Sequence, residues 1–228
     1  MSARGLFVTG TDTGVGKTRV AVALIRALQA QGLRVAGMKP VSAGSAPGEL
    51  NEDVAALHEA ADVKTDLHDL NPYAFTEAIA PHIAAERAGM RIELGVIAAA
   101  YARLAAAADV VVIEGAGGWR TPLNEREDIA DLAQALGLPV VLVVGLRLGC
   151  LSHARLTVES ISGRQLPWAG WIGNHIDPQM ARPVENLATL HGCLPGPSLG
   201  VSPHAPHERL TRVPQWLTLP RDLVFSKK

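Results

Sequence analysis

The sequence predicts an α/β fold, in which a doubly wound, mostly parallel sheet carries helices on both faces. Short apolar runs alternate with amphipathic stretches along the chain, and a glycine-rich turn joins the first such pair. The run 109–114 (DVVVIE) is a continuous β-branched segment, typical of a strand that is buried on both faces. At 228 residues, we expect 1–228 to form one large domain, with a tail from about residue 205 that shows no clear pattern.

Five apolar runs predict strands. They are 6–8, 33–38, 109–114, 139–144 and 168–174. The second strand should stop at Pro40, because proline lacks the N–H group that a ladder strand needs. Residues 41–51 are rich in Ser, Gly and Pro and predict a loop, and 70–75 predict an irregular surface segment near the site.

The stretches between these strands have helical patterns. We expect helices at 20–28, 52–61, 81–88, 92–108, 129–136, 152–162, 185–190 and 208–216, the first of them beginning near Lys17. Gly32 and Gly137 follow two of these helices as C-cap residues. Ligands of a parallel sheet bind beyond the carboxyl ends of its strands, so the functional residues should gather there.

The run 8–18 (VTGTDTGVGKT) predicts a phosphate-binding loop between the first strand and the first helix. Glycines let backbone N–H groups converge on phosphate oxygens, and the helix adds the positive end of its dipole. Lys17 would reach the β- and γ-phosphates, and the Thr18 hydroxyl would bind Mg²⁺. The usual glycine at position 11 is Thr11 here, and Gly10 stands one residue earlier. The alternative is a glycine-rich turn with a chance lysine, but the flanking strand and helix favour a nucleoside triphosphate site.

Further reactive side chains stand at the carboxyl ends of strands: Lys39, Glu114 and Asn174. Glu114 would be the acidic residue of a Mg²⁺ site, and the alternative is an acid that is simply solvated by water. Lys39 would offer a positive charge to a transferring phosphate, and the alternative is a solvated lysine at a sheet edge. Asp53 lies in the first turn of a helix, where the helix dipole explains it as well as metal binding does.

Composition excludes several classes of protein. A net charge of −1 argues against nonspecific nucleic-acid binding. No apolar run reaches the ~18 residues needed to span a bilayer, and the first strand starts too early for a signal peptide. Cys150 and Cys193 lack metal or redox spacing, so we expect reduced packing residues. We therefore expect a cytoplasmic protein that binds neither nucleic acid nor membrane.

Several segments of the chain resemble the dethiobiotin synthetase family. They are Phe7 through Thr18, Lys39-Pro40-Val41, Asn71-Pro72-Tyr73, Pro81-His82, Glu114-Gly115-Ala116-Gly117-Gly118-Trp119, Leu142-Val143-Val144-Gly145, Leu148-Gly149-Cys150, and Ala169-Gly170-Trp171-Ile172 with Asn174. They occur in family order from residue 5 to about 205. A phosphate loop alone is shared by many enzymes, but the shifted glycine and the EGAGGW segment make the resemblance specific.

The resemblance implies a homodimer that uses ATP and Mg²⁺ to close a ureido ring on 7,8-diaminononanoate with CO₂. One amine captures CO₂ as a carbamate, whose oxygen attacks the γ-phosphorus to give a carbamic–phosphoric mixed anhydride. The second amine closes the ring and expels phosphate, so that dethiobiotin, ADP and phosphate are the products. Lys17, Lys39 and Mg²⁺ would screen the repulsion between the carbamate and the triphosphate.

The resemblance also implies roles for individual residues. Lys17 and Lys39 are the implied catalytic residues, and Thr18, Asp53 and Glu114 are the implied metal residues. The implied nucleotide-binding residues are Thr13, Gly14, Val15, Gly16, Lys17, Thr18, Arg19, Asp53, Glu114, Gly115, Ala116, Gly117, Asn174, His175, Pro203, His204 and Ala205, of which Asn174 and 203–205 flank the adenine. The implied substrate residues are Ser42 and the helix start at Gly149, Cys150 and Leu151, which would bind the substrate carboxylate from the partner chain. Ala43 and Asn186 depart from the hydroxyl residue and the tyrosine found in relatives.

Two other interpretations stay open at this point. A partition-type ATPase, a nucleotide switch that dimerises and binds a partner, shares the shifted phosphate loop. Such proteins normally carry a signature lysine where this chain has Asp12-Thr13-Gly14. An amidotransferase-like cobyrinate diamide synthase carries an additional glutaminase domain, for which we expect this chain to be too short.

Overall fold

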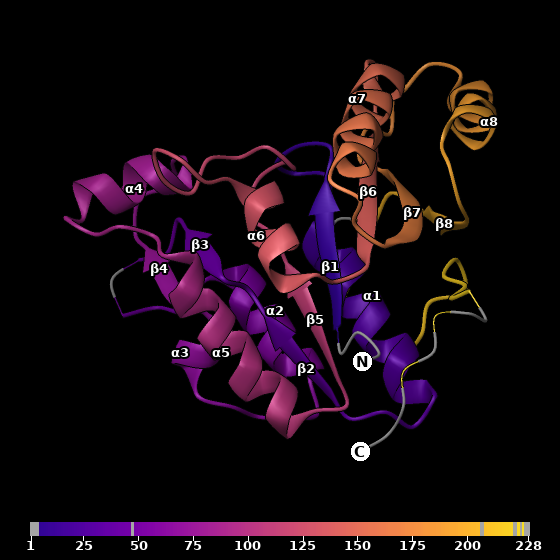
Figure 1. Cartoon of the computed structure of the whole chain (residues 1–228). Coiled ribbons are helices and arrows are strands. Elements are labelled where there is room, and N and C mark those ends of the chain that lie inside the picture. The colour runs from indigo at the N-terminus through magenta and orange to yellow at the C-terminus, as the bar shows by residue number, and fades with distance from the viewer. Residues whose placement is uncertain (1–4, 47, 206–207, 221–222, 224, 226–228) are drawn as a thin grey trace.

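A six-stranded sheet runs through the middle of the molecule (Figure 1). The computed structural model describes residues 5–46, 48–205, 208–220, 223 and 225. The strands of the sheet are β1 (Gly5–Gly10), β2 (Val35–Met38), β5 (Val110–Glu114), β6 (Val140–Leu146), β7 (Trp168–His175) and β8 (Ser198–Ser202). Their order is β2-β5-β1-β6-β7-β8, and each neighbouring pair is parallel. The predicted α/β class with a doubly wound parallel sheet is confirmed.

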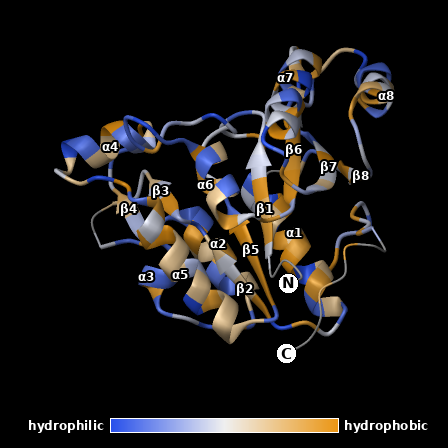
Figure 2. Cartoon of the chain, in the orientation of Figure 1, coloured by the Kyte–Doolittle hydropathy of each residue, from blue (hydrophilic) through white to orange (hydrophobic). Residues whose placement is uncertain are grey.

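Helices cover both faces of this sheet (Figure 1). One face carries α1 (Lys17–Ala30) and α2 (Glu52–Ala60), and the other carries α5 (Leu94–Ala107), α6 (Ile129–Leu136) and α7 (Cys150–Gly163). Successive side chains of a strand point to opposite faces, so Leu6 and Val8 pack with α1 while Phe7 packs with α5 and α6. All three are fully buried. Figure 2 shows the result, with apolar strands inside and polar helix faces outside.

A small two-stranded parallel sheet lies beside the large one and corrects two predictions. It consists of β3 (Val41–Ala43) and β4 (Tyr73–Phe75), and it is accompanied by α3 (Leu67–Leu70) and α4 (Pro81–Arg87). We expected a loop at 41–51 and an irregular segment at 70–75. The second strand does end before Pro40 as predicted, but Val41 then pairs with Tyr73. Three-residue strands are too short to show a period, so only their pairing reveals them.

The C-terminal part of the chain also differs from the prediction. After α8 (Pro183–Cys193) the chain forms β8, which the sequence did not reveal, and the helix expected at 208–216 is absent from the described residues 208–220. Pro214 would interrupt such a helix. Instead, Leu217 forms an isolated bridge with Gly200 and is buried against α1. The segment therefore runs along α1, at the lower right of Figure 1.

The remaining helices and strands lie where the sequence predicted them, with ends that differ by a few residues. The largest shift lengthens α8, which was expected at 185–190 and extends over Pro183–Cys193. β1 is also longer at both ends than the expected 6–8, and α7 begins two residues earlier, at Cys150. Among the described residues, no helix is both long and apolar enough to cross a bilayer. All of this places the carboxyl ends of β1, β2, β5, β6 and β7 along one edge of the sheet.

Candidate active site

The turn between β1 and α1 is built around Val15, whose side chain is 1 % exposed. A Cβ atom on Gly10 would lie 2.6 Å from Val15 Cγ2, and one on Gly145 would lie 2.8 Å from Val15 Cγ1. Packing against Val15 therefore accounts for the glycine at position 10. Gly16 precedes α1 with a φ of 88°, a left-handed conformation that glycine adopts without a steric penalty.

Lys17 is the first residue of α1, and its side chain folds back over the loop. Its Nζ donates to the carbonyl oxygen of Asp12 at 3.0 Å. Burial lowers the pKa of Lys17 from 10.5 to about 8, although the Glu114 carboxylate opposes this effect. A poorly solvated ammonium group gains from an anion placed beside it. A phosphate group bound in the loop would therefore stabilise the charged form of Lys17.

Four side chains from separate parts of the chain meet beyond the ends of β2 and β5. Lys39 Nζ lies 2.5 Å from Glu114 Oε1 and 2.7 Å from Asp53 Oδ2. Thr18 Oγ1 lies 2.6 Å from Asp53 Oδ1 and 3.0 Å from Glu114 Oε1. Lys39 and Glu114 are 4 % and 1 % exposed, so the alternative of two water-solvated side chains is wrong. The structure brings together the groups that the sequence places at this edge.

The charges in this cluster control one another. Burial would raise the pKa of Asp53, but the Lys39 ammonium and the Thr18 hydroxyl outweigh burial and lower it. Burial would lower the pKa of Lys39, but Glu114 and Asp53 outweigh burial and raise it. For Glu114 burial dominates and raises the pKa despite Lys39. Glu114 is therefore the carboxylate that gains most from additional positive charge nearby.

The oxygen atoms of this cluster suit a hard divalent cation. Glu114 Oε2 is buried and has no hydrogen-bond partner among the described residues, and the oxygens of Asp53 and Thr18 stand beside the same carboxylate. Mg²⁺ takes oxygen ligands and usually keeps several from water and from substrate phosphates. The described residues contain no group of three or more His, Cys, Asp or Glu that could hold a metal alone. The donor set thus fits Mg²⁺ in the company of a triphosphate.

The segment that follows β5 lies against the phosphate loop. The N–H of Gly115 donates to Val8 O at 2.9 Å, and the N–H of Trp119 donates to Gly10 O at 3.2 Å. The Trp119 indole donates to Ser160 Oγ at 3.1 Å, which ties the segment to α7. A cavity of about 420 Å³ lies between the loop, this segment and α7. This cavity offers space for a second substrate beside the phosphate loop.

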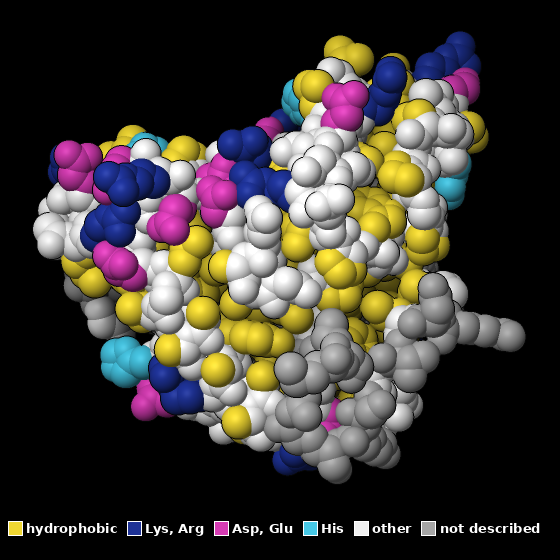
Figure 3. Space-filling model, viewed as in Figure 1, with side chains coloured by type: hydrophobic (Ala, Val, Ile, Leu, Met, Phe, Trp, Pro, Cys, Tyr) yellow, Lys and Arg dark blue, Asp and Glu magenta, His cyan; other side chains and the backbone are white. Residues whose placement is uncertain are grey.

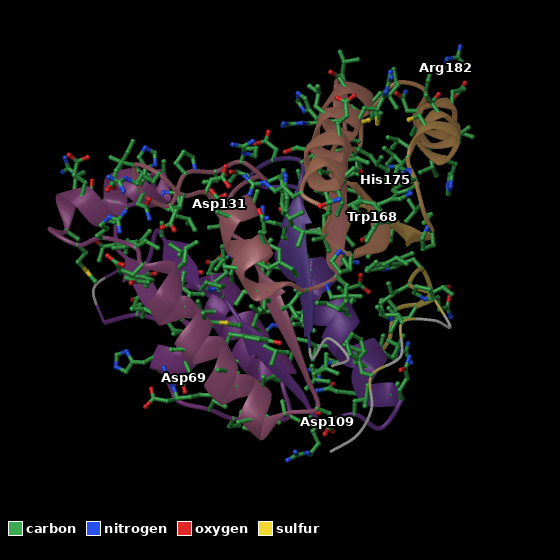
Figure 4. All side chains as sticks on the ribbon, in the orientation of Figure 1. Asp69, Asp109, Asp131, Trp168, His175 and Arg182 are labelled. Atoms are coloured by element: carbon green, nitrogen blue, oxygen red, sulfur yellow. The ribbon has the colours of Figure 1, made fainter. Side chains whose placement is uncertain are left out.

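Asn174 closes the other side of the loop, at the end of β7. Its Nδ2 donates to Val15 O at 2.9 Å, and a Cβ atom on Gly16 would lie 2.1 Å from that same nitrogen. His175 follows at the end of β7 (Figure 4), and its carbonyl oxygen lies 3.0 Å from His204 Nδ1. The acids therefore stand on the β2–β5 side of the loop, and Asn174, His175 and His204 stand on the β7–β8 side.

The other predicted nucleotide-binding residues fall into four places. Thr13 and Gly14 lie in the loop, Arg19 in the first turn of α1, Ala116 and Gly117 in the segment after β5, and Pro203 and Ala205 after β8. Gly14 and Gly117 have φ values of 72° and 64°, a conformation that glycine adopts without a steric penalty. All four places border the edge at which the strands end.

Comparison with known proteins gives the family of this chain. Residues 4–215 match the family model AAA_26, an AAA domain. The ATP-dependent dethiobiotin synthetase BioD of Aromatoleum aromaticum is 51 % identical over 220 residues, which cover 95 % of this chain and 98 % of the relative. The BioD of Nitrosospira multiformis is 52 % identical over 201 residues, 88 % of either chain, and that of Xylella fastidiosa strain 9a5c is 53 % identical over 210 residues, 90 % of this chain and 92 % of the relative. This chain belongs to the dethiobiotin synthetase family.

Solved structures resemble this dethiobiotin synthetase family member in fold alone. The septum site-determining protein MinD from Pyrococcus horikoshii, solved with Mg-ADP, has a TM-score of 0.57 at 17 % identity, over 89 % of this chain and 82 % of that one. The signal recognition particle receptor FtsY from Elizabethkingia anophelis has a TM-score of 0.55 at 16 % identity, over 97 % and 63 % of the two chains. Both matches support the predicted phosphate-loop NTPase fold.

The substrate residues implied by the dethiobiotin synthetase resemblance lie in two separate places. Ser42 is in β3, where its buried hydroxyl donates to Asn71 Oδ1 at 2.9 Å. Gly149 precedes α7 with a φ of 93° and without a side-chain cap. Cys150 is 1 % exposed, as predicted for a packing residue, but Cys193 is exposed, so the same prediction is wrong for Cys193. Leu148, which lies near Cys150 in the chain, is 92 % exposed.

Sequence reasoning missed two residues that shape the dethiobiotin synthetase site. Asn71 was quoted within a motif but given no role, yet its Nδ2 donates to Lys39 O at 2.6 Å and thereby fixes the backbone of that lysine. Arg147 precedes the Gly149 turn, and its guanidinium forms an ion pair with Asp12 of the phosphate loop. Both contacts join distant parts of the chain, so no local spacing signals them.

Proposed function

We propose that this protein is an ATP-dependent dethiobiotin synthetase, which converts 7,8-diaminononanoate, CO₂ and ATP into dethiobiotin, ADP and phosphate. The observation that carries the proposal is the cluster beside the phosphate loop, in which the buried Lys39 and Glu114 meet the partly buried Asp53 and Thr18. The identity of half the residues with curated synthetases over nearly the whole chain supports the same activity. One domain over 1–228 and a location in the cytoplasm are further parts of the proposal.

The phosphate loop would bind the phosphates of ATP, and the carboxylates of Asp53 and Glu114 would bind its Mg²⁺. Backbone N–H groups at Gly14, Gly16 and the start of α1, together with the Lys17 ammonium, would bind the phosphates. Thr18, Asp53 and Glu114 would hold Mg²⁺, which when bound supplies positive charge to the triphosphate. Asn174, His175 and 203–205 would flank the adenine on the β7–β8 side, and Gly115 to Gly117 would line the loop from the β5 side.

Lys39 would act where charge accumulates during the reaction. Carbamate oxygen and γ-phosphorus must form a bond while the bond to the ADP oxygen breaks, and both reactants are anionic. The Lys39 ammonium, fixed by two carboxylates, would stabilise this charge without having to reorganise. Positioning of the reactants would contribute ~7–11 kcal/mol more. In the second step, the remaining amine attacks the carbonyl carbon, the carbon–oxygen bond to phosphate breaks, and the ring closes.

The diamine site would be shared between two chains of a homodimer. The 420 Å³ cavity beside the loop supports a substrate at this place. Ser42, which the family resemblance implies as a substrate residue, is not among the residues that line this cavity. Leu148 and Leu156 of the α7 region and Val184 of α8 are 92 %, 61 % and 75 % exposed, and the dimer interface would cover these apolar side chains. Figure 3 shows hydrophobic side chains around α7. In the dimer, the start of α7 at Gly149 to Leu151 would bind the substrate carboxylate of the partner's site.

A partition-type nucleotide switch is the alternative, which shares the shifted phosphate loop but has no further support. The MinD structure from Pyrococcus horikoshii shares only the fold, at 17 % identity. The signature lysine of such switches would stand at Asp12, whose carboxylate instead pairs with Arg147 in the same chain. The cobyrinate diamide synthase interpretation likewise has no support among the curated relatives named above.

Phosphate release measured with and without the diamine and bicarbonate tests the proposed function. A synthetase releases phosphate only when both are present, and mass spectrometry should then detect dethiobiotin in equal amount. Phosphate release that is independent of the diamine would refute the synthetase and favour the switch.

A further inference from the structure

Arg19 joins the first turn of α1 to the segment that follows β8. Its Nε donates to Ser202 Oγ at 2.9 Å, its Nη1 donates to Ala205 O at 3.1 Å, and its Nη2 forms an ion pair with Glu208 Oε2 at 2.5 Å. The guanidinium also lies 6.0 Å from the centre of the Trp216 ring. The side chain is only 13 % exposed. All three guanidinium nitrogens are thus directed to the C-terminal part of the chain.

These contacts lie on the side of the loop where the nucleoside half of ATP belongs. Lys39 and Glu114 mark the side of the terminal phosphate, since the metal and the transferring group must meet there. The sugar and base must then extend to the opposite side, toward β7 and β8. The described residues at that side are Asn174 and the segment 202–205, which is irregular after Ser202. A segment without a ladder of its own takes its position from side-chain contacts.

We infer that Arg19 is a positioning residue for the nucleoside of ATP, which fixes the wall formed by 202–205 and does not bind phosphate. The inference rests on the proposed function, because it takes ATP as the ligand. A guanidinium group suits this task, since its planar fork directs several charge-assisted hydrogen bonds at once. A wall that is fixed before binding also spares the ligand the cost of ordering it.

Arg26 provides a matched control two helical turns further along α1. It contacts the same C-terminal segment, with Nε 3.4 Å from Leu210 O, and its Nη1 donates to Ala60 O at 3.0 Å. Arg26 therefore has the same chemistry and also holds the segment, but at a distance from the loop. Replacement of Arg26 should affect stability without affecting the nucleoside.

The test compares a non-hydrolysable ATP analogue with inorganic tripolyphosphate, which lacks the nucleoside. Calorimetry with Mg²⁺ measures both affinities for the full-length wild type, Arg19→Ala and Arg26→Ala. We expect Arg19→Ala to lower the affinity for the ATP analogue about tenfold or more, because charge-assisted hydrogen bonds are lost from the wall. The affinity for tripolyphosphate should change less than about twofold. Arg26→Ala should change either affinity less than about twofold.

An equal loss of affinity for the two ligands in Arg19→Ala would overturn the inference, because Arg19 would then act on the phosphates. No weakening of the analogue would overturn it as well. If Arg19→Ala does not fold, Ser202→Ala removes a single acceptor oxygen. It should lower the affinity for the ATP analogue by a smaller factor and again leave the affinity for tripolyphosphate nearly unchanged. A wild-type protein that binds neither ligand would instead refute the proposed function itself.

Discussion

Lys39 and Glu114 are separated by 75 residues in the chain, yet Lys39 Nζ lies 2.5 Å from Glu114 Oε1. The register of the sheet explains this proximity. β2 and β5 are parallel neighbours in which Met38 pairs with Ile113, so the next residue of each strand arrives at the same point. A buried pair of this kind is costly to break, because the remaining partner keeps a charge without compensation.

Replacement of Lys39 by Ala should lower kcat about a hundredfold or more while raising the KM for ATP much less, because its charge acts mainly in the transition state. Steady-state kinetics with saturating diamine and bicarbonate measure both values. Lys64→Ala is the matched control, since Lys64 is an exposed lysine far from the cluster, and it should leave both values unchanged. A loss confined to KM would contradict the catalytic role.

Glu114→Gln should raise the Mg²⁺ concentration needed for half-maximal activity about tenfold or more, because a neutral amide is a poor ligand for a hard cation. Asp53→Asn should act in the same direction. Glu52→Gln changes the exposed neighbour of Asp53 in the same helix turn and serves as the control. Identical Mg²⁺ titrations for Glu114→Gln and Glu52→Gln would exclude Glu114 from the metal site.

The affinity for ATP should fall as the pH rises above about 8. The pKa of Lys17 is about 8 in the free protein, so the ammonium form dominates below this pH and binding needs no added proton. Above it, Lys17 must take up a proton from the solvent when ATP binds, and the affinity falls by up to about tenfold per pH unit. Calorimetry at pH 9 in buffers of different ionisation enthalpy should detect this proton uptake. A flat affinity between pH 7 and pH 9 would contradict the lowered pKa.

Gly16→Ala should impair folding and ATP binding more than Gly14→Ala does. Both glycines have positive φ, 88° and 72°, where alanine costs about 1–2 kcal/mol. Only the new Cβ atom at Gly16 meets a neighbour, Asn174 Nδ2 at 2.1 Å, and moving it breaks the bond to Val15 O. Thermal unfolding with and without ATP measures the difference. Adding Asn174→Ala to Gly16→Ala should recover part of the stability, and no recovery would mean that the clash is not the cause.

The sequence predicted the parts of the fold that have a continuous local pattern. The run 110–113 is apolar without interruption and is a buried central strand, and Lys39 and Glu114 could be placed because each follows such a strand. The sheet of β3 and β4 was missed because three residues show no period. The prediction of a helix at 208–216 was wrong, because Leu210 and Trp216 pack against α1 and Pro214 interrupts helical hydrogen bonding.

The candidate site likewise has residues that the sequence predicted and contacts that it could not predict. Residues of the phosphate loop and the strand ends could be found from the sequence, because the motif and the parallel sheet fix their position. The contacts of Asn71 with Lys39, and of Arg147 with Asp12, depend on which segments become neighbours after folding. No spacing along the chain encodes such contacts, so they became visible only in three dimensions.

Val15 belongs to the hydrophobic interior and to the phosphate loop at once, since it packs with Gly10 and Gly145. The conformation of the phosphate loop is consequently fixed when the sheet folds, and the loop cannot become disordered while the hydrophobic core stays folded. Heating should therefore abolish nucleotide binding and unfold the sheet at the same temperature. We expect no intermediate in which the sheet is folded but the loop no longer binds phosphate.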